Sequence, residues 1–243
     1  MQVSIDMGTS VQFVLSSALI IYSDGKNSIV TRHPINGVKQ EGAVPSLGSG
    51  AAITQEFVEQ LYRSAHRASG VEILSPNVLC NQPGFISWWA PACVRPLFFE
   101  STKNTDEAAL LNSLSGKMFP VPAMVFAVRD RKLYAFALAR SERPSKDTKM
   151  FRAPFWNIYA NGNVCMGSAE LPKHGGESTI SEWENAFYMS AFTHANGAAV
   201  TKLKGGFAAL CKRNVGKKQF SSEHLVPFDT GATLEAILNA CLE

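Results

Sequence analysis

Two apolar runs on either side of a short charged turn constrain the fold of this chain more than any other feature of its sequence. Residues 121–128 and 132–139 are almost entirely apolar, and Arg129, Asp130 and Arg131 lie between them. Apolar runs of this length that are joined by a short polar turn are typical of a β-hairpin. The sequence therefore predicts an antiparallel strand pair at this place.

Two other parts of the sequence also indicate strands. Apolar runs at residues 13–22 and 28–35, with a polar turn between them, predict a hairpin near the N-terminus. The aromatic stretch 85–100 is interrupted by Pro91 and Pro96, which favours short strands and a structured loop over a helix.

Helices are predicted where apolar residues recur with helical spacing. Ser181 and Glu184 have the spacing of a capping box, and Gly197 is placed to stop the helix that follows them. The other helices are expected from Thr54 to about residue 70, from Thr105 to Leu114, at residues 200–213 and at residues 231–242.

Length and composition fit one large domain, or a core with a small module attached. The chain has 243 residues, 46% of them hydrophobic, which is enough to bury a sizeable core. Its formal net charge of +3 comes from interspersed basic and acidic residues, so no basic face of the kind that binds a phosphate backbone stands out. We therefore do not expect nucleic acid as a partner.

The sequence also gives no sign of a leader or of a membrane span. Residues 1–6 lack a basic start followed by a long apolar run, and no stretch approaches the roughly 20 apolar residues that cross a bilayer. We therefore expect a cytoplasmic protein with no membrane partner.

The five cysteines have neither the close pairs of a zinc site nor the density of a disulfide framework. Cys165 differs from the others because it follows an Asn-Gly turn, at Asn161 and Gly162, on a polar loop. A nucleophilic cysteine must be a thiolate that solvent can reach, and an ordered polar loop favours that state. The default for a lone cysteine is a buried structural thiol, which we expect for Cys80, Cys93, Cys211 and Cys241.

The residues around Cys165 resemble the active-site signature of the ubiquitin-conjugating superfamily. That signature has a His-Pro-Asn tripeptide, then a short turn with glycine, then the active cysteine followed by an apolar residue. Asn157, Gly162 and Cys165 match it with the same spacing, whereas Phe155 and Trp156 stand in place of histidine and proline. The resemblance implies that Cys165 is the residue that forms the thioester.

A prokaryotic branch of that superfamily, the conjugating-like family D, also lacks this histidine and has one after the cysteine instead. His174 and His194 are the candidates here, and the Phe-Thr-His-Ala-Asn context at the end of a predicted helix favours His194. Three blocks, at residues 86–99, 155–167 and 183–194, further resemble members of this branch from plasmid-associated PRTRC systems.

The resemblance implies an α+β fold of the ubiquitin-conjugating type, an antiparallel meander with flanking helices. We expect an N-terminal β-hairpin module and linker at residues 1–50, the conjugating-type domain at 51–205 and a C-terminal helical extension at 206–243.

It also implies a chemistry that needs no cofactor. Cys165 would take the carboxyl end of a ubiquitin-like modifier from a ThiF-type activating enzyme and pass it to an amine. The resemblance also implies other PRTRC proteins as partners. The side-chain amide of Asn157 would donate a hydrogen bond to the oxyanion that develops, a contribution on the order of 3 kcal/mol in comparable sites. His194 would orient groups or take the proton of the amine, since histidine titrates near neutral pH.

Several plainer interpretations stay open. Asn157 can instead hydrogen-bond its own loop, and His194 can cap the last carbonyls of a helix. The whole chain can be a non-catalytic interaction subunit that keeps the fold without the chemistry, or, with less support, a Cys-His hydrolase. The aromatic pair Trp88 and Trp89 is expected in the core, and the basic group Lys212, Arg213, Lys217 and Lys218 on a solvated surface.

Overall fold

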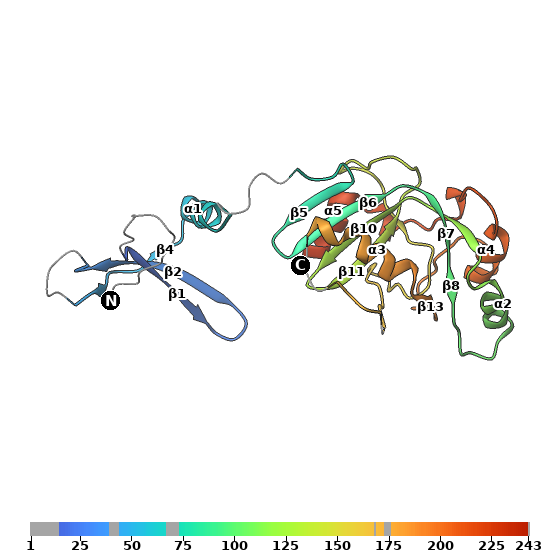
Figure 1. Cartoon of the computed structure of the whole chain (residues 1–243), viewed down its shortest axis with the longest axis horizontal. Coiled ribbons are helices and arrows are strands. Elements are labelled where there is room, and N and C mark those ends of the chain that lie inside the picture. Colours follow the sequence, from blue (N-terminus) through green and yellow to red (C-terminus); the bar gives the residue numbers. More distant parts are fainter. Residues whose placement is uncertain (1–14, 39–43, 67–72, 168, 173–175, 243) are drawn as a thin grey trace. The chain divides into compact units, whose positions relative to one another are not determined.

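The structure is a computed structural model that describes residues 15–38, 44–66, 73–167, 169–172 and 176–242. The chain divides into two compact units, Met1–Ile73 and Leu74–Glu243 (Figure 1). The three-part division that the resemblance implies, after residues 50 and 205, stays a prediction.

The first unit contains the predicted N-terminal hairpin. Strand β1 (Ser17–Ser23) pairs antiparallel with β2 (Ser28–Asn36), so the expected strand pair is confirmed. The turn forms because the carboxylate of Asp24 accepts hydrogen bonds from the backbone amides of Lys26 and Asn27, at 2.8 and 2.6 Å.

Two short strands and one helix complete the described part of this unit. Strands β3 (Ser46–Leu47) and β4 (Ala51–Ala52) pair antiparallel with β2. Helix α1 (Gln55–His66) begins after Thr54, whose hydroxyl accepts a hydrogen bond from the amide of Phe57 at 3.3 Å, as the sequence predicts.

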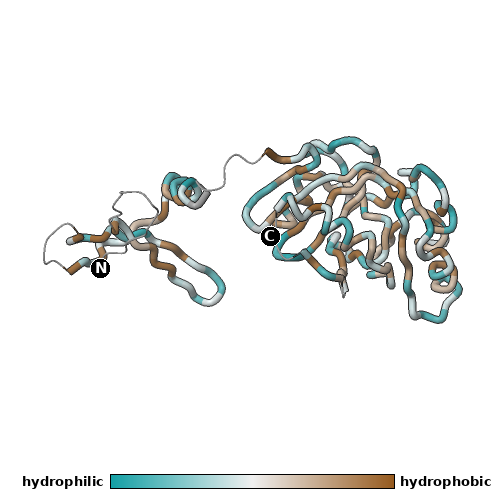
Figure 2. The backbone as a smooth tube through the Cα atoms, viewed as in Figure 1, coloured by the Kyte–Doolittle hydropathy of each residue, from teal (hydrophilic) through white to brown (hydrophobic). Residues whose placement is uncertain are grey.

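The apolar side chains of the first unit are open to solvent. No described side chain in this unit is buried, and Ile21 and Ile29 are 68% and 67% exposed. Figure 2 shows apolar residues along both strands of the hairpin and polar residues at its tip. The described residues of this unit therefore form no buried core of their own.

The second unit is built on an antiparallel sheet with the strand order β12-β11-β10-β6-β5. Its central hairpin is the one that the sequence predicts most clearly, and the turn residues Asp130 and Arg131 have positive φ angles of 47° and 65°. The five strands are β5 (Val78–Gln82), β6 (Phe85–Ala90), β10 (Met124–Arg129), β11 (Lys132–Ala137) and β12 (Phe151–Arg152).

Both faces of this sheet are covered. On one face Trp88 stacks on Phe126 with the ring centroids 5.4 Å apart, and Phe187 of helix α3 (Ile180–Tyr188) packs edge-on against Phe126. On the other face Phe136 packs against Phe228, at 5.1 Å, beside helix α5 (Leu234–Leu242). The core therefore lies on both sides of the central strands, and α3 and α5 cover opposite faces (Figure 1).

The remaining elements extend the face covered by α3. Strand β7 (Cys93–Pro96) pairs antiparallel with β9 (Met118–Val121), and β8 (Phe98–Phe99) pairs parallel with β13 (Ala191–Phe192). Helix α2 (Asp106–Leu114) is capped by the hydroxyl of Thr105 and packs on α4 (Gly206–Asn214). The expected α+β class is confirmed, and this arrangement is compatible with a ubiquitin-conjugating-type fold.

The helix predicted from Ser181 to Gly197 is only partly correct. Helix α3 starts one residue before Ser181, which therefore lies inside it and does not cap it, and it ends at Tyr188. The chain leaves the helix because Phe192 is fully buried in β13, where it pairs with Phe99. This long-range pairing overrides the helical periodicity of the sequence.

The C-terminal segment belongs to the same compact unit as the sheet. Leu210 in α4 and Ile237 in α5 are each only 3% exposed and lie in the two core clusters. Helix α1, which we expected to open the conjugating-type domain, lies in the first unit. Within the described ranges, no helix is both long and apolar enough to cross a bilayer.

Candidate active site

Cys165 lies at the end of a small hairpin formed by residues 157–165. Ile158 and Val164 form an antiparallel bridge across this hairpin. The backbone amide of Cys165 donates to the carbonyl oxygen of Asn157 at 2.7 Å, which closes the hairpin at its open end. Cys165 is thus held directly opposite Asn157.

The hairpin is fixed to the edge of the central sheet. The amide of Ala135 donates to the Gly162 carbonyl at 2.9 Å, and the amide of Val164 donates to the Leu133 carbonyl at 2.8 Å. Gly162 has a φ of +86°, and a Cβ atom at this position would run into the ring of Phe136. Only glycine fits here, which explains the turn glycine that the sequence analysis identified.

Two aromatic residues anchor the start of the hairpin where the superfamily signature has histidine and proline. Phe155 stacks on Phe192 at 5.3 Å and meets Phe187 edge-on at 5.4 Å, whereas Trp156 packs on Phe207 at 5.3 Å. Both side chains are buried. Apolar packing therefore holds the entry to this loop.

The side chain of Asn157 connects the hairpin to the segment that follows β13. Its Nδ2 atom donates to the Ala191 carbonyl at 2.9 Å. Its Oδ1 atom accepts from the amide of Thr193 at 3.0 Å, from the hydroxyl of Thr193 at 3.1 Å and from the amide of His194 at 3.2 Å. The side chain of Asn157 therefore bonds the segment 191–194 and not its own loop, and it links this segment to the Cys165 hairpin.

The backbone of Asn157 supports the same connection. Its amide donates to the carbonyl of His194 at 3.0 Å, and its φ is +61°, a conformation that asparagine tolerates better than most residues. Because only one of the two Nδ2 hydrogens is used in these bonds, the other is available to a bound group.

The thiol of Cys165 is half-buried and lines a groove with a volume of about 450 Å³. All three residues that the sequence singled out line this groove, namely Cys165, Asn157 and His194. Its other described lining residues are Glu100, Met166, Gly167, Ala169, Glu170, Asn185, Ala186, Met189, Ser190, Ala191 and Thr193. The three predicted site residues, of which Asn157 and His194 are 37 positions apart in the chain, therefore lie around one groove.

His194 reaches the groove from a loop and not from a helix end. The preceding helix already stops at Tyr188, so the alternative interpretation, in which His194 caps the last carbonyls of a helix, does not hold. Its Nδ1 atom lies 2.7 Å from the hydroxyl of Thr193, which fixes the orientation of the ring. The other candidate histidine, His174, lies outside the described residues.

Tyr159 is a site residue that the sequence analysis missed. The side chain of Cys165 raises the pKa of Tyr159 above its ordinary value, as a hydrogen-bond partner of the phenol and through the negative charge of its thiolate. The signal that could have identified Tyr159 is the pairing register of the hairpin at residues 157–165. Residues 159 and 165 are diagonal neighbours on one face of a hairpin in which Ile158 opposes Val164.

The other cysteines have different surroundings. Burial raises the pKa of the thiols of Cys80 and Cys211, and burial raises the pKa of Cys241 to about 11. The thiol of Cys93 accepts a hydrogen bond from Nε of Arg95 at 3.3 Å. Across the described ranges, no group of three or more His, Cys, Asp or Glu side chains is arranged to hold a metal ion.

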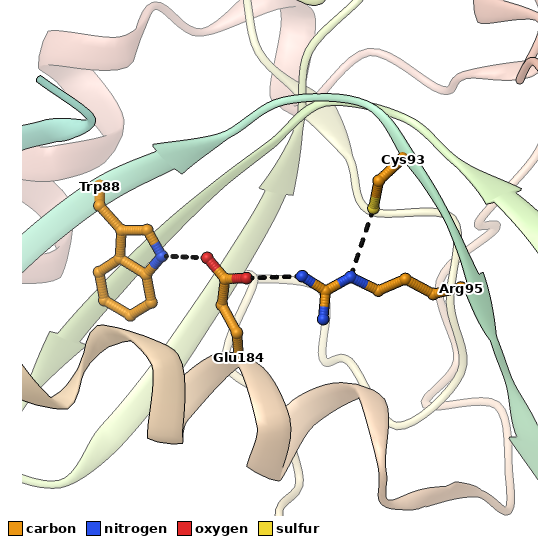
Figure 3. Close-up of polar contacts among 4 residues, drawn as sticks. All are labelled: Trp88, Cys93, Arg95 and Glu184. Atoms are coloured by element: carbon orange, nitrogen blue, oxygen red, sulfur yellow. Dashed lines mark hydrogen bonds and ion pairs between the residues drawn. The ribbon is translucent and has the colours of Figure 1, made fainter.

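A polar cluster fixes the helix that forms one wall of the groove (Figure 3). Glu184 accepts from the indole of Trp88 at 3.1 Å and pairs with Arg95 at 2.9 Å, and the guanidinium lies 4.4 Å from the centre of the Tyr188 ring. Glu184 therefore serves this cluster and not the capping box that the sequence suggested. The next residue, Asn185, lines the groove.

The comparison with known protein families identifies the family of the chain. The model of Prokaryotic E2 family D matches residues 54–228, which is well over half of the sequence. The chain belongs to Prokaryotic E2 family D. The match includes the Cys165 hairpin, β13 and His194, so the whole groove lies within the family's region. No curated protein and no solved structure matches the chain.

Replacing Asn157 tests its role in holding the loop. Asn157→Ala removes the acceptor of two partly buried backbone amides, so we expect the free energy of unfolding to fall by about 1–3 kcal/mol. Asn161→Ala is the control, because its side chain accepts only from Asn163 in an exposed turn, at 3.1 Å. Urea unfolding of both variants makes the comparison, and equal losses would contradict the assignment.

The contact between Tyr159 and Cys165 predicts a reciprocal change in titration. The hydrogen bond and the thiolate charge both disfavour the phenolate, so Cys165→Ala should lower the pKa of Tyr159 towards that of a free tyrosine. Ultraviolet difference titration measures this, with Tyr159→Phe used to subtract the other tyrosines. An unchanged Tyr159 transition in Cys165→Ala would show that the two side chains do not interact.

Proposed function

We propose that this protein carries a ubiquitin-like modifier as a thioester on Cys165 and transfers it to an amine. The observation that carries this proposal is the position of the Cys165 thiol, which is half-buried at the edge of a groove of about 450 Å³ that Asn157 and His194 also line. A thiol that solvent can reach beside a hydrogen-bond donor suits a nucleophile, because the donor stabilises the thiolate. Membership of Prokaryotic E2 family D supports the same chemistry.

The first step of the proposed reaction is a thiol–thioester exchange. The Cys165 thiolate attacks the carbonyl carbon of the modifier's thioester on the activating enzyme, and the new S–C bond replaces the old one. The activating enzyme leaves as a thiolate. In the second step an amine attacks the same carbon, Cys165 leaves as a thiolate, and the hydroxyl of Tyr159 stabilises that leaving group by its hydrogen bond.

Two further residues have proposed roles in the second step. His194, which lines the groove with Cys165, takes the proton that the attacking amine releases. Asn157 holds the groove together, and its second Nδ2 hydrogen donates to the oxyanion of the tetrahedral intermediate.

The proposed partners follow from the family. We infer a ThiF-type activating enzyme and a small ubiquitin-like or peptide modifier, with no resident cofactor, in the cytoplasm. The three sequence blocks at residues 86–99, 155–167 and 183–194 support a place in a plasmid-associated PRTRC system, as its protein B.

A second candidate is a non-catalytic interaction subunit of the same system. The specific observation in its favour is that Phe155 and Trp156 replace the His-Pro of the signature and serve the core. The amide of Asn157 is also committed to loop bonds, which an interaction subunit would need just as much.

Adduct trapping separates the two candidates. Incubation with the ThiF-type partner, ATP and the modifier should give an adduct on Cys165 that excess thiol releases, since a thioester exchanges with free thiols. Cys165→Ser should give an ester that resists thiol, or no adduct at all. Intact mass measurement after denaturation reads both outcomes.

The matched control is Cys93→Ser, because Cys93 is also half-buried but lies outside the groove. This variant should form the adduct as the unchanged chain does. If an activating enzyme that is charged with modifier never transfers it to the chain, the interaction subunit is the correct reading.

A further inference from the structure

Strand β1 forms an edge of the N-terminal sheet and has none of the features that usually protect such an edge. Among the described residues it pairs with β2 alone, in one register without a bulge. The strand is Ser-Ala-Leu-Ile-Ile-Tyr-Ser, so it contains neither a charged residue nor a proline. Folded proteins blunt exposed edges with charges, prolines or bulges, or they cover them. We therefore expect another strand to cover β1.

The backbone groups that β1 leaves open belong to its odd-numbered residues. Just before the strand, the carbonyl of Ser16 accepts from the amide of Ile35 at 3.1 Å. Just after it, the amide of Asp24 donates to the carbonyl of Asn27 at 3.2 Å. The even-numbered residues between them are therefore hydrogen-bonded to β2, because the direction of these groups alternates along a strand. The amides and carbonyls that point away from β2 are those of Ser17, Leu19, Ile21 and Ser23.

These open groups match a second copy of the same strand. In an antiparallel pair of two copies, odd-numbered residues must face odd-numbered residues, and a register centred on Ile20 uses the whole strand. Ile20 then faces its own counterpart, and Leu19 faces Ile21. The small side chain of Ala18 faces the large ring of Tyr22. Apolar side chains thus meet apolar side chains along the pair, and no like charges are brought together.

The opposite edge of this sheet limits the association to two copies. Strands β3 and β4, of 2 residues each, both pair with β2 on the side away from β1. Very short strands are a common way to close an edge. With one open edge among the described strands of this sheet, pairing gives a closed two-fold dimer. Two open edges would instead give a growing fibre.

The exposed apolar side chains of the first unit supply a driving force for this pairing. Leu19, Ile21 and Tyr22 are 44%, 68% and 52% exposed. A two-stranded hairpin is only marginally stable by itself, and further strands are needed to stabilise it. Pairing two copies of β1 places two hairpins in one sheet and buries part of these side chains against their counterparts.

We propose that two copies of this chain associate through β1, which pairs antiparallel with β1 of the other copy in the register centred on Ile20. The absence of charge along β1 favours a second copy over a partner that is selected by opposite charge. The dimer carries two Cys165 sites, and its formation does not depend on the thioester chemistry.

A cysteine in place of Ile20 tests the register. In the dimer this residue faces itself at a position without direct hydrogen bonds, where the two Cα atoms lie about 4.5 Å apart, within the range that a disulfide spans. Under mild oxidation Ile20→Cys should give a covalent dimer on a non-reducing denaturing gel, with the link between the two introduced cysteines. Ile29→Cys is the control, because Ile29 is 67% exposed but lies on β2, away from the shared edge. This variant should stay uncrosslinked.

Removing one open amide tests the pairing without any cross-link. Leu19→Pro deletes an amide that points away from β2, so the hairpin should persist while the dimer loses two hydrogen bonds. Sedimentation equilibrium of the unchanged chain should give twice the 26.4 kDa of one copy. Leu19→Pro should raise the Kd of the dimer roughly tenfold or more relative to Leu19→Ala, which keeps the amide.

Three results would overturn the proposal. The first is an unchanged chain that sediments as a monomer, which is expected if a strand of the second unit or of another protein covers β1. The second is Ile20→Cys that cross-links no more than Ile29→Cys. The third is an equal Kd for Leu19→Pro and Leu19→Ala.

Discussion

The hydrogen bonds of one asparagine determine where the candidate active site lies. Asn157 has positive φ, its carbonyl fixes the amide of Cys165, and its side chain fixes Ala191, Thr193 and His194. Without these bonds the cysteine hairpin and the segment after β13 would have no polar connection at this point. The groove, and the presence of a histidine in it, both depend on this residue.

Apolar packing in the core also holds the hairpin that the hydrogen bonds of Asn157 connect to the segment after β13. Phe155 and Trp156 are buried next to Phe192 and Phe207, so the loop is held to the core where the superfamily has histidine and proline. Glycine at position 162 lets the hairpin approach the Phe136 ring. A rigid hairpin then presents Cys165 and Tyr159 on one face, which is what a nucleophile and its hydrogen-bond donor require.

The parts that the sequence predicted well depend on local contacts. The hairpin β10–β11 and the cap at Thr105 follow from neighbouring residues, and Cys165 and Asn157 stand out through their spacing. What was missed depends on distant contacts. The end of α3 is set by the pairing of β13 with β8, and the partners of Glu184 come from β6 and β7. The position of Tyr159 beside Cys165 could not be predicted, because it follows only from the register in which Ile158 pairs with Val164.

The most direct measurement of the central claim is competitive alkylation of the five cysteines with iodoacetamide at neutral pH, followed by mass spectrometry of the peptides. Cys165 should be modified first, because its half-buried thiol lines the groove and lies on a polar loop. Cys80, Cys211 and Cys241 should lag, since burial raises the pKa of each thiol. A Cys165 that reacts no faster than these three, or later than Cys93 beside its arginine, would contradict the account.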